Sequence, residues 1–353
     1  MRKIAILYLL GALLVSGCVR DEFDTTRVVE GAAARISLKI TLPVMGGGTD
    51  TRAVSADVEK RLDNLFVLVF DGGGKIVTRH RYTAQTGASL SSLLIDTRSG
   101  KGHTLCFVAN VKDGMDSQLM ALTSYNALKG LLVTATELNL GQSTDVPLIM
   151  TAIMENVNVQ EGANSISNPV QLQFLAAKVT LTLVDNTPDT QEVTIIGWDV
   201  QDAPTRSYLF PDDSKDANPN PETAGADKDE YWLTTGVDYP FEEEDKQAGT
   251  ATQTLYVFEN RRGGRIARAL PADPDEQYSN MGLNDKDSRG KAWYKPKRAT
   301  AIVVTAMHKA DLATRQIKAF IYLGQDNHSD YNIRRGHHYT LSLIHISEPT
   351  RRR

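Results

Sequence analysis

Two cysteine thiols are the most reactive side chains in this 353-residue sequence. Cys106 lies within the apolar stretch TLCFVA at 104–109, which predicts a buried and chemically inert thiol. Cys18 instead follows an apolar run close to the N-terminus, where a lipid could be attached. With only these two cysteines, one near the N-terminus and one in an apolar stretch, the chain can form neither a zinc site built from thiolates nor a disulfide scaffold. The only thiol chemistry that we expect is therefore lipidation of Cys18.

The remaining groups that could bind a metal or transfer a proton lack the spacing for it. None of the seven histidines has a partner at HxxxH or HExxH spacing, and the acidic residues between Asp212 and Glu230 lack the register of a calcium loop. Nucleophile motifs are absent as well. We therefore expect neither enzymatic activity nor a cofactor. A formal net charge of −4 gives no electrostatic basis for binding nucleic acid.

The segment before Cys18 has the layout of an export signal. The apolar run Ile4–Val15 would reach only about 18 Å as a helix, whereas the hydrocarbon core of a bilayer measures about 30 Å. Arg2 and Lys3 precede the run, and small residues follow it. The sequence LVSGC that ends at Cys18 resembles a bacterial lipobox, in which cleavage occurs between Gly17 and the cysteine. An ordinary secreted protein with an unmodified thiol is the alternative.

Most of the remaining sequence predicts β-structure. Apolar residues alternate with polar ones over a strand that ends at Pro43, and they are Ile36, Leu38, Ile40 and Leu42. Further strands are expected at 65–70, 104–109, 147–153, 169–185, 191–200, 253–259, 299–308, 315–323 and 339–343, with a helix at 117–132. The segment 170–184 is long for one strand, so it is expected to bend or to bridge two domains. Short strands with little helix favour an all-β fold of two β-sandwich domains with one or two short helices.

Several segments resemble one known family in their order and spacing. TRA at 51–53 precedes LFVLVFDG at 65–72, which is followed by TLCFVAN at 104–110 and PLIMTA at 147–152. In this respect roughly Ile36–Val184 resembles the N-terminal domain of the fimbrillins of Bacteroidales, the subunits of type V pili. LYVFEN at 255–260 and the stretch 322–339 resemble the C-terminal domain of fimbrillin-like lipoproteins. The resemblance implies two transthyretin-like β-sandwiches and no enzymatic activity.

The resemblance also implies a mechanism of assembly. In this family an arginine-specific protease removes the first strand, and a neighbouring subunit donates a strand to the groove. The matching cleavage point lies between Arg52 and Ala53, in a glycine-rich linker, and the displaceable strand would carry Ile36, Leu38, Ile40 and Leu42. The implied partners are other fimbrial subunits and, through the lipid on Cys18, the outer membrane. Acidic residues after Cys18 resemble the signal that exports lipoproteins to the cell surface. Two fates stay open: an anchor that keeps strand and lipid, or a subunit released into fimbriae.

A different class of function is a surface glycan-binding lipoprotein of a nutrient-uptake system. Exposed aromatic rings would stack on sugars in such a protein. Trp232, Trp293 and Tyr294 lie near predicted loops and are the candidates, whereas Trp198 lies in a predicted strand. Packing in a core is the more common role for each of these aromatic side chains.

The expected organisation has five parts. Residues 1–17 form the lipoprotein signal, 18–52 the lipidated segment with the removable strand, 53–186 the N-terminal sandwich and 187–343 the C-terminal sandwich. Residues 344–353 resemble a translated sequencing adapter, which implies a non-native tail after about Leu343. A genuine basic tail is the alternative.

Overall fold

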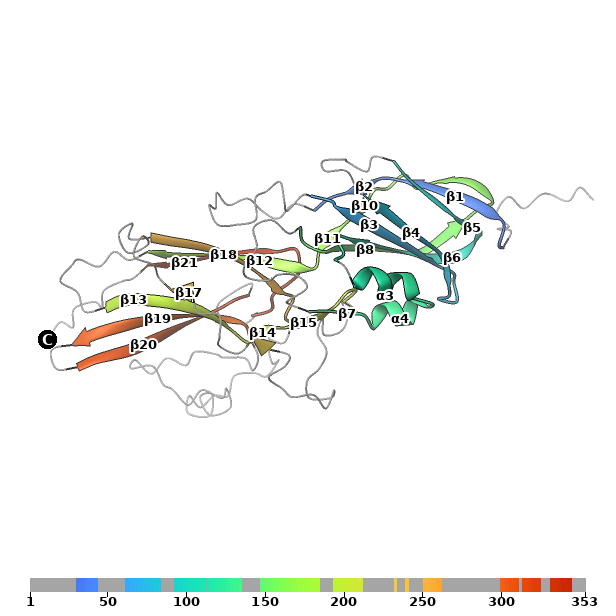
Figure 1. Ribbon diagram of the computed structural model, residues 1–353. Helices are drawn as coiled ribbons and strands as arrows, with labels where there is room; N and C mark the ends of the chain where they lie inside the picture. The colour runs from blue at the N-terminus through green and yellow to red at the C-terminus, as the bar shows by residue number, and fades with distance from the viewer. Residues whose placement is uncertain are drawn as a thin grey trace, which may run out of the picture.

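Two β-sandwiches follow one another along the chain, and two short helices lie beside the first (Figure 1). The computed structural model describes residues 30–43, 61–83, 92–112, 114–134, 147–184, 193–211, 232–233, 239–240, 250–261, 299–310, 313–324 and 331–344. The prediction of an all-β fold with two sandwiches and one or two short helices is confirmed.

The first sandwich has a five-stranded sheet opposite a smaller layer. The larger sheet has the order β11-β8-β6-β3-β4, built from β3 (Asn64–Phe70), β4 (Ile76–Thr83), β6 (Gly100–Ala109), β8 (Met150–Val159) and β11 (Gln173–Phe174). The smaller layer has the order β5-β1-β9 and a two-stranded continuation, β10-β2. Its strands are β1 (Ala33–Leu38), β2 (Ile40–Thr41), β5 (Leu93–Arg98), β9 (Gly162–Ser165) and β10 (Val170–Gln171). Phe107 and Phe174 are buried on the face of the larger sheet that meets the smaller layer, whereas Phe66 and Phe70 are buried on its other face, where Phe70 packs against Tyr125.

The apolar pattern of each strand follows from its place in these layers. Every residue from Leu65 to Phe70 is fully buried, because β3 lies inside the larger sheet and both of its faces are covered. β5 shows strict alternation instead, with Leu93, Ile95 and Thr97 buried and the residues between them exposed. Such alternation is typical of a strand with one face toward solvent.

The prediction of one helix at 117–132 is wrong in extent. The chain forms α3 (Met115–Ala121) and α4 (Tyr125–Lys129), separated by extended backbone at Leu122 and Ser124. The break occurs because the main chain pairs elsewhere: the carbonyl of Thr123 accepts from Ile76, and Ser124 bridges to the β3–β4 turn. The Ser124 side chain caps α4 by accepting from the amide of Ala127 at 3.2 Å. Among the described residues, no helix has the length and hydropathy of a membrane span.

The stretch from Val170 to Val184 connects the two sandwiches. β10 and β11 pair with strands of the first sandwich, whereas β12 (Ala176–Val184) pairs with strands of the second. Leu175 packs in the first core and Ala177 in the second, so the chain crosses between these two residues. The crossing therefore precedes residue 186, where the sequence placed the end of the N-terminal domain.

The second sandwich has one three-stranded and one four-stranded sheet. Their orders are β18-β12-β21 and β17-β13-β19-β20, with β13 (Val193–Gln201), β17 (Tyr239–Pro240), β18 (Thr250–Phe258), β19 (Ala301–Ala310), β20 (Ala313–Tyr322) and β21 (His338–Ile344). Side chains of β12, β13, β18 and β19 form its core, and these include Val179, Leu181, Trp198, Leu255 and Ile302. A small pair, β14 (Ala203–Pro204) with β16 (Trp232–Leu233), lies beside them.

The two sandwiches are joined by more than the crossing chain. β7 (Leu132–Thr134) follows the helices and pairs with β15 (Arg206–Tyr208), which follows β13 and β14 in the second half of the chain. Beyond β15, the amide of Leu209 donates to the carbonyl of Leu131 at 2.9 Å. Residues from the second half also pack in the first core, namely Leu209, Phe210, Tyr256 and Phe258. The junction is therefore an apolar contact closed by a short β-ladder.

Candidate functional site

The predicted displaceable strand lies in the middle of its sheet. β1 pairs antiparallel with β5, from Ala33 opposite Arg98 to Leu38 opposite Leu93, and parallel with β9 on its other side. β2 continues the same line beside β10. On the side of β9 and β10, the carbonyl oxygens of Ser37, Lys39 and Thr41 accept main-chain hydrogen bonds of 2.9, 2.7 and 3.0 Å. The donors are the amides of Ile166, Val170 and Leu172. β1 thus occupies a slot with main-chain partners along both edges, and β2 has a strand partner, β10, on one side.

The inner face of this segment is part of the first core. Ile36, Leu38 and Ile40 are buried, and Ala34 is a fourth buried apolar side chain in the same row. Leu42 is half-buried and packs against the rim of the same core. The structure therefore places all four predicted residues on the core side, and their displacement remains a prediction.

The outer face of β1 carries an exposed ion pair. Arg35 Nε lies 2.5 Å from Asp96 Oδ1 on β5, and both side chains are mostly exposed. The hydrogen bond from Arg35 lowers the pKa of the Asp96 carboxyl, and the same contact raises the pKa of Arg35. Because both groups are solvated, the pair supplies little stability.

β5 is tied in turn to the larger sheet by two side chains of β4. His80 Nε2 lies 2.7 Å from the carbonyl oxygen of Asp96, and the Tyr82 hydroxyl donates to the carbonyl of Leu94 at 2.7 Å. Burial, aided by the charge of Asp96, raises the pKa of Tyr82 to about 12. One wall of the slot is therefore fixed independently of β1.

The start of β1 is fastened to the turn between β5 and β6. The amide of Gly31 donates to the carbonyl of Ser99 at 2.8 Å, and the Ser99 amide donates to the carbonyl of Ala32 at 2.9 Å. Ser99 Oγ also accepts from the amide of Ala32 at 2.9 Å, and Glu30 accepts from the amide of Lys101 at 3.2 Å. These contacts must break before the strand can leave.

The other predicted site residues lie outside the described residues. They are Gly17 and Cys18 at the expected signal cleavage and lipidation site, and Arg52 and Ala53 at the expected processing site. Their roles therefore stay predictions.

The sequence reasoning missed both walls of the slot. β5 carried a usable signal, because Leu93, Ile95 and Thr97 alternate with exposed residues as in β1. β9, with the sequence GANS, has no apolar signal, since it holds β1 through its main chain. Asn164 of β9 adds local bonds to Gln160 at 2.8 Å, which fix the turn before the strand.

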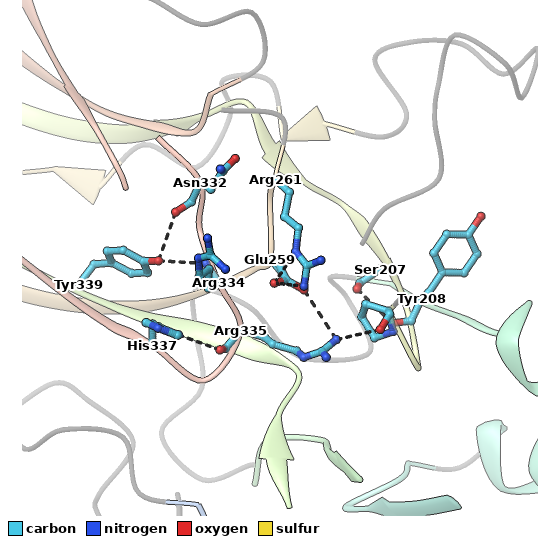
Figure 2. A network of polar contacts seen from close by, with 10 residues as sticks. Ser207, Tyr208, Glu259, Arg261, Asn332, Arg334, Arg335, His337 and Tyr339 are labelled. Atoms are coloured by element: carbon cyan, nitrogen blue, oxygen red, sulfur yellow. Dashed lines mark hydrogen bonds and ion pairs between the residues drawn. The ribbon is translucent and has the colours of Figure 1, made fainter. Parts of the chain in front are cut away.

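A second group of polar residues lies where β18 ends (Figure 2). The Glu259 side chain is only 2% exposed, and Arg261 Nη2 lies 2.9 Å from its Oε1. Arg335 Nη1 lies 3.7 Å from Oε2 of the same carboxylate and donates to the carbonyl of Pro211 at 3.3 Å. The Tyr339 hydroxyl accepts from the Arg334 amide at 2.9 Å. We call Glu259, Arg261 and Arg335 the junction cluster; it joins the end of β18 to the segment that leads into β21.

The remaining chemical candidates are packing residues where they are described. Cys106 is fully buried and burial raises its pKa, so the prediction of an inert thiol is confirmed. Trp198 is 3% exposed in the second core and offers no platform to a sugar. The side chain of Trp232, and all of Trp293 and Tyr294, lie outside the described residues. Within the part of the chain that is described, no three metal-ligating side chains gather.

Two family matches cover most of the described chain. Residues 34–200 match a family described as the major fimbrial subunit protein, FimA, and residues 255–343 match a domain of unknown function, DUF4906. A curated relative, the candidate fimbrium tip subunit Fim1C of Parabacteroides distasonis, is 26% identical over 232 residues. That similarity covers 60% of this chain and 60% of the relative, so the chain matches only part of the relative's length.

Solved structures share the arrangement of the two sandwiches. A candidate cell adhesion protein of Bacteroides eggerthii superposes with a TM-score of 0.56 at 17% identity, over 90% of this chain and 88% of the other. The tip fimbrial protein Mfa3 of Porphyromonas gingivalis, with a C-terminal truncation, gives 0.54 at 15% identity, over 90% and 96%. At such identities these two structures show the fold alone. The family match shows that residues 34–200 are similar to a FimA-type fimbrial subunit domain, and the curated relative is a fimbrial subunit of a Bacteroidales species.

Proposed function

We propose that the protein is a structural, non-enzymatic component of a bacterial surface fimbria. It is exported as a lipoprotein with lipid on Cys18, and it serves either as a subunit that accepts a donated strand or as the membrane anchor. The observation that carries the proposal is the slot of β1, in which a strand with main-chain partners on both sides also fills the core. A removable strand in such a place turns a closed sandwich into a template for another chain.

The energetics favour replacement of the strand rather than a lasting vacancy. Burying Ile36, Leu38 and Ile40 stabilises the fold by about 1.5–3 kcal/mol for each side chain. Their loss would leave apolar pockets and unpaired main-chain groups on β5 and β9. A donor strand regains both contributions if its apolar residues recur at every second position, because a shift of one residue would turn them to solvent.

Cleavage after Arg52 would decide between the two roles. Cys18 and β1 both lie on the N-terminal side of that residue, so one cut would release the lipid and the strand together. An uncut chain would keep both and remain at the outer membrane. Placement at the cell surface follows from either role.

The first test is the mature N-terminus of the protein expressed in a Bacteroidales host. Processing predicts a chain that begins at Ala53, and an anchor predicts a chain that begins at acylated Cys18. R52A should convert the first result into the second without lowering the protein level, whereas R35A on the exposed face of β1 is the control. A mature chain that begins at neither residue would contradict the lipoprotein pathway.

The second test is strand exchange in vitro. A specific protease site replaces GGGTDTR at 46–52, the folded protein is cleaved, and a labelled peptide with the sequence of residues 33–42 is added. Incorporation of this peptide, and exclusion of a peptide that carries Asp in place of Ile36, is the expected result. Equal incorporation of both peptides, or none after cleavage, would remove strand exchange from the proposal.

A further inference from the structure

β20 is a long and regular edge strand. It is the last strand in the order β17-β13-β19-β20 and pairs with β19 from Ala313 to Tyr322 without a bulge. Its sequence, ATRQIKAFIY, contains neither proline nor glycine. Among the described residues no strand pairs with its free side. Proteins usually interrupt such an edge with a bulge, a proline or a covering strand, and within the described ranges β20 has none of these.

The core-facing row of β20 is also uncovered. Ile317 and Ala319 lie opposite Ala306 and Val304 of β19, and Val304 belongs to the second core. These two residues of β20 therefore face the core side, yet both are exposed, Ile317 by 44%. An apolar row that faces inward without cover fits an additional strand whose side chains would complete it.

The charges along β20 indicate which kind of partner strand could pair with it. Arg315 and Lys318 are exposed, carry no ion-pair partner among the described residues, and no acidic residue occurs within β20. Two copies of β20 paired with each other would place four cations on one short ladder, and such like charges destabilise a strand pair. The charge therefore disfavours a second copy of this chain and favours an acidic partner.

We propose that β20 is a docking edge for an extended acidic segment of another protein chain. The segment would add a strand beside β20, turn alternate apolar side chains toward Ile317 and Ala319, and place carboxylates beside Lys318, which lies in the opposite row. This surface is separate from the slot of β1, and it needs neither cleavage nor removal of a strand.

The test uses a fluorescent ten-residue peptide of alternating Val and Glu, added to the whole protein. Fluorescence anisotropy should show at least tenfold tighter binding than for the matching peptide of Val and Lys. I317K should weaken binding of the acidic peptide at least tenfold, because it places a charge in the inward row. The matched control is I196K, since Ile196 is similarly exposed, 42%, but lies on β13 inside the same sheet.

A second pair of measurements locates the peptide and its charge preference. Hydrogen exchange should slow in β20 when the acidic peptide binds, and a chain with K318E should prefer the Lys peptide. Equal binding to the I317K and I196K variants, protection of β5 and β9 in place of β20, or self-association of the chain through β20 would each overturn the proposal. Native tryptophan fluorescence verifies that every variant is folded.

Discussion

In each sandwich a buried asparagine follows the end of one core strand, but the two asparagines have different hydrogen-bond partners. β6 runs into Asn110 with the sequence TLCFVAN, and β18 runs into Asn260 with TLYVFEN. Both side chains are buried, and in both the amide nitrogen donates across the end of the sandwich. A buried amide that satisfies several groups at once rigidifies its surroundings.

Asn110 binds only the main chain of its own sandwich. Its Nδ2 donates to the carbonyl oxygens of Arg61 and Leu148 at 3.0 and 2.9 Å, and its Oδ1 accepts from the amide of Asp63 at 2.9 Å. These partners precede β3 and β8, the strands on either side of β6. Its backbone has φ 61°, a left-handed conformation that asparagine tolerates better than most residues.

Asn260 depends on another side chain. Its Nδ2 donates to Thr300 Oγ1 at 2.9 Å and to the carbonyl of Asp202 at 3.4 Å, and the Thr300 hydroxyl donates to the same carbonyl at 2.8 Å. Its main chain bridges to Ile333 in both directions, at 3.0 and 2.9 Å. The preceding residue is Glu259 of the junction cluster.

The two sandwiches therefore fix the end of a core strand in different ways. The end of β6 is fixed by main-chain groups alone. The end of β18 is fixed within the second sandwich through the Thr300 side chain as well, and the neighbouring Glu259 carries the contacts of the junction cluster.

The largest expected effect is the loss of Asn110. N110A should lower the free energy of unfolding by about 4 kcal/mol, because three main-chain groups lose their partner and alanine is strained at a positive φ. N260A should cost about 2 kcal/mol, since the Thr300 hydroxyl keeps its bond to Asp202. Urea unfolding followed by circular dichroism measures both variants.

Tryptophan fluorescence separates the two domains in that experiment, because Trp198, Trp232 and Trp293 all follow residue 186. N110A should shift the dichroism more than the fluorescence. N110G controls for backbone strain and should be milder by about 1 kcal/mol. Equal losses for N110A and N260A by both probes would break the comparison.

The next effect concerns the junction cluster. E259A removes a buried carboxylate from two arginines that are each less than one-fifth exposed, which should cost about 3 kcal/mol. The fluorescence transition should move to lower urea, and it should do so at high salt as well, because buried pairs are weakly screened. D96N, which breaks the exposed pair of Arg35 and Asp96, is the control and should leave the midpoint unchanged. Similar shifts in both variants would show that burial of the cluster contributes nothing.

The smallest effect is a pH dependence with one tyrosine in each sandwich. Burial raises the pKa of both Tyr82 and Tyr322 to about 12, compared with 10.0 for a free phenol. Their contribution to stability is therefore complete below pH 10 and is lost as the pH rises toward 12, because only the unfolded chain then releases the protons easily. Y82F should flatten this loss in the dichroism signal, and Y322F should flatten it in the fluorescence signal. Phenolate absorbance that titrates fully near pH 10 in the folded protein would contradict both.

The features that could be predicted best from the sequence are those that depend on a local pattern of apolar residues. Continuous apolar runs located β3 and β6, and alternation located the inner face of β1. The strand neighbours of β1 could not be found in this way, because Arg35 meets Asp96 and Asn164 across 61 and 129 residues of sequence. The break between α3 and α4 was missed for the same reason, since Thr123 and Ser124 pair with a distant turn. Tertiary pairing outweighed local propensity at these points.

The central position of β1 has a mechanical consequence. A strand with ladders on both sides, pulled along its axis, loads all of its hydrogen bonds together, because ladder bonds run across the strand direction. A strand at an edge, peeled from one end, breaks its bonds one after another. In a fibre built as proposed, a donor seated in this slot would bear tension in shear, and its lifetime under load would be set by the unfolding rate rather than by equilibrium affinity.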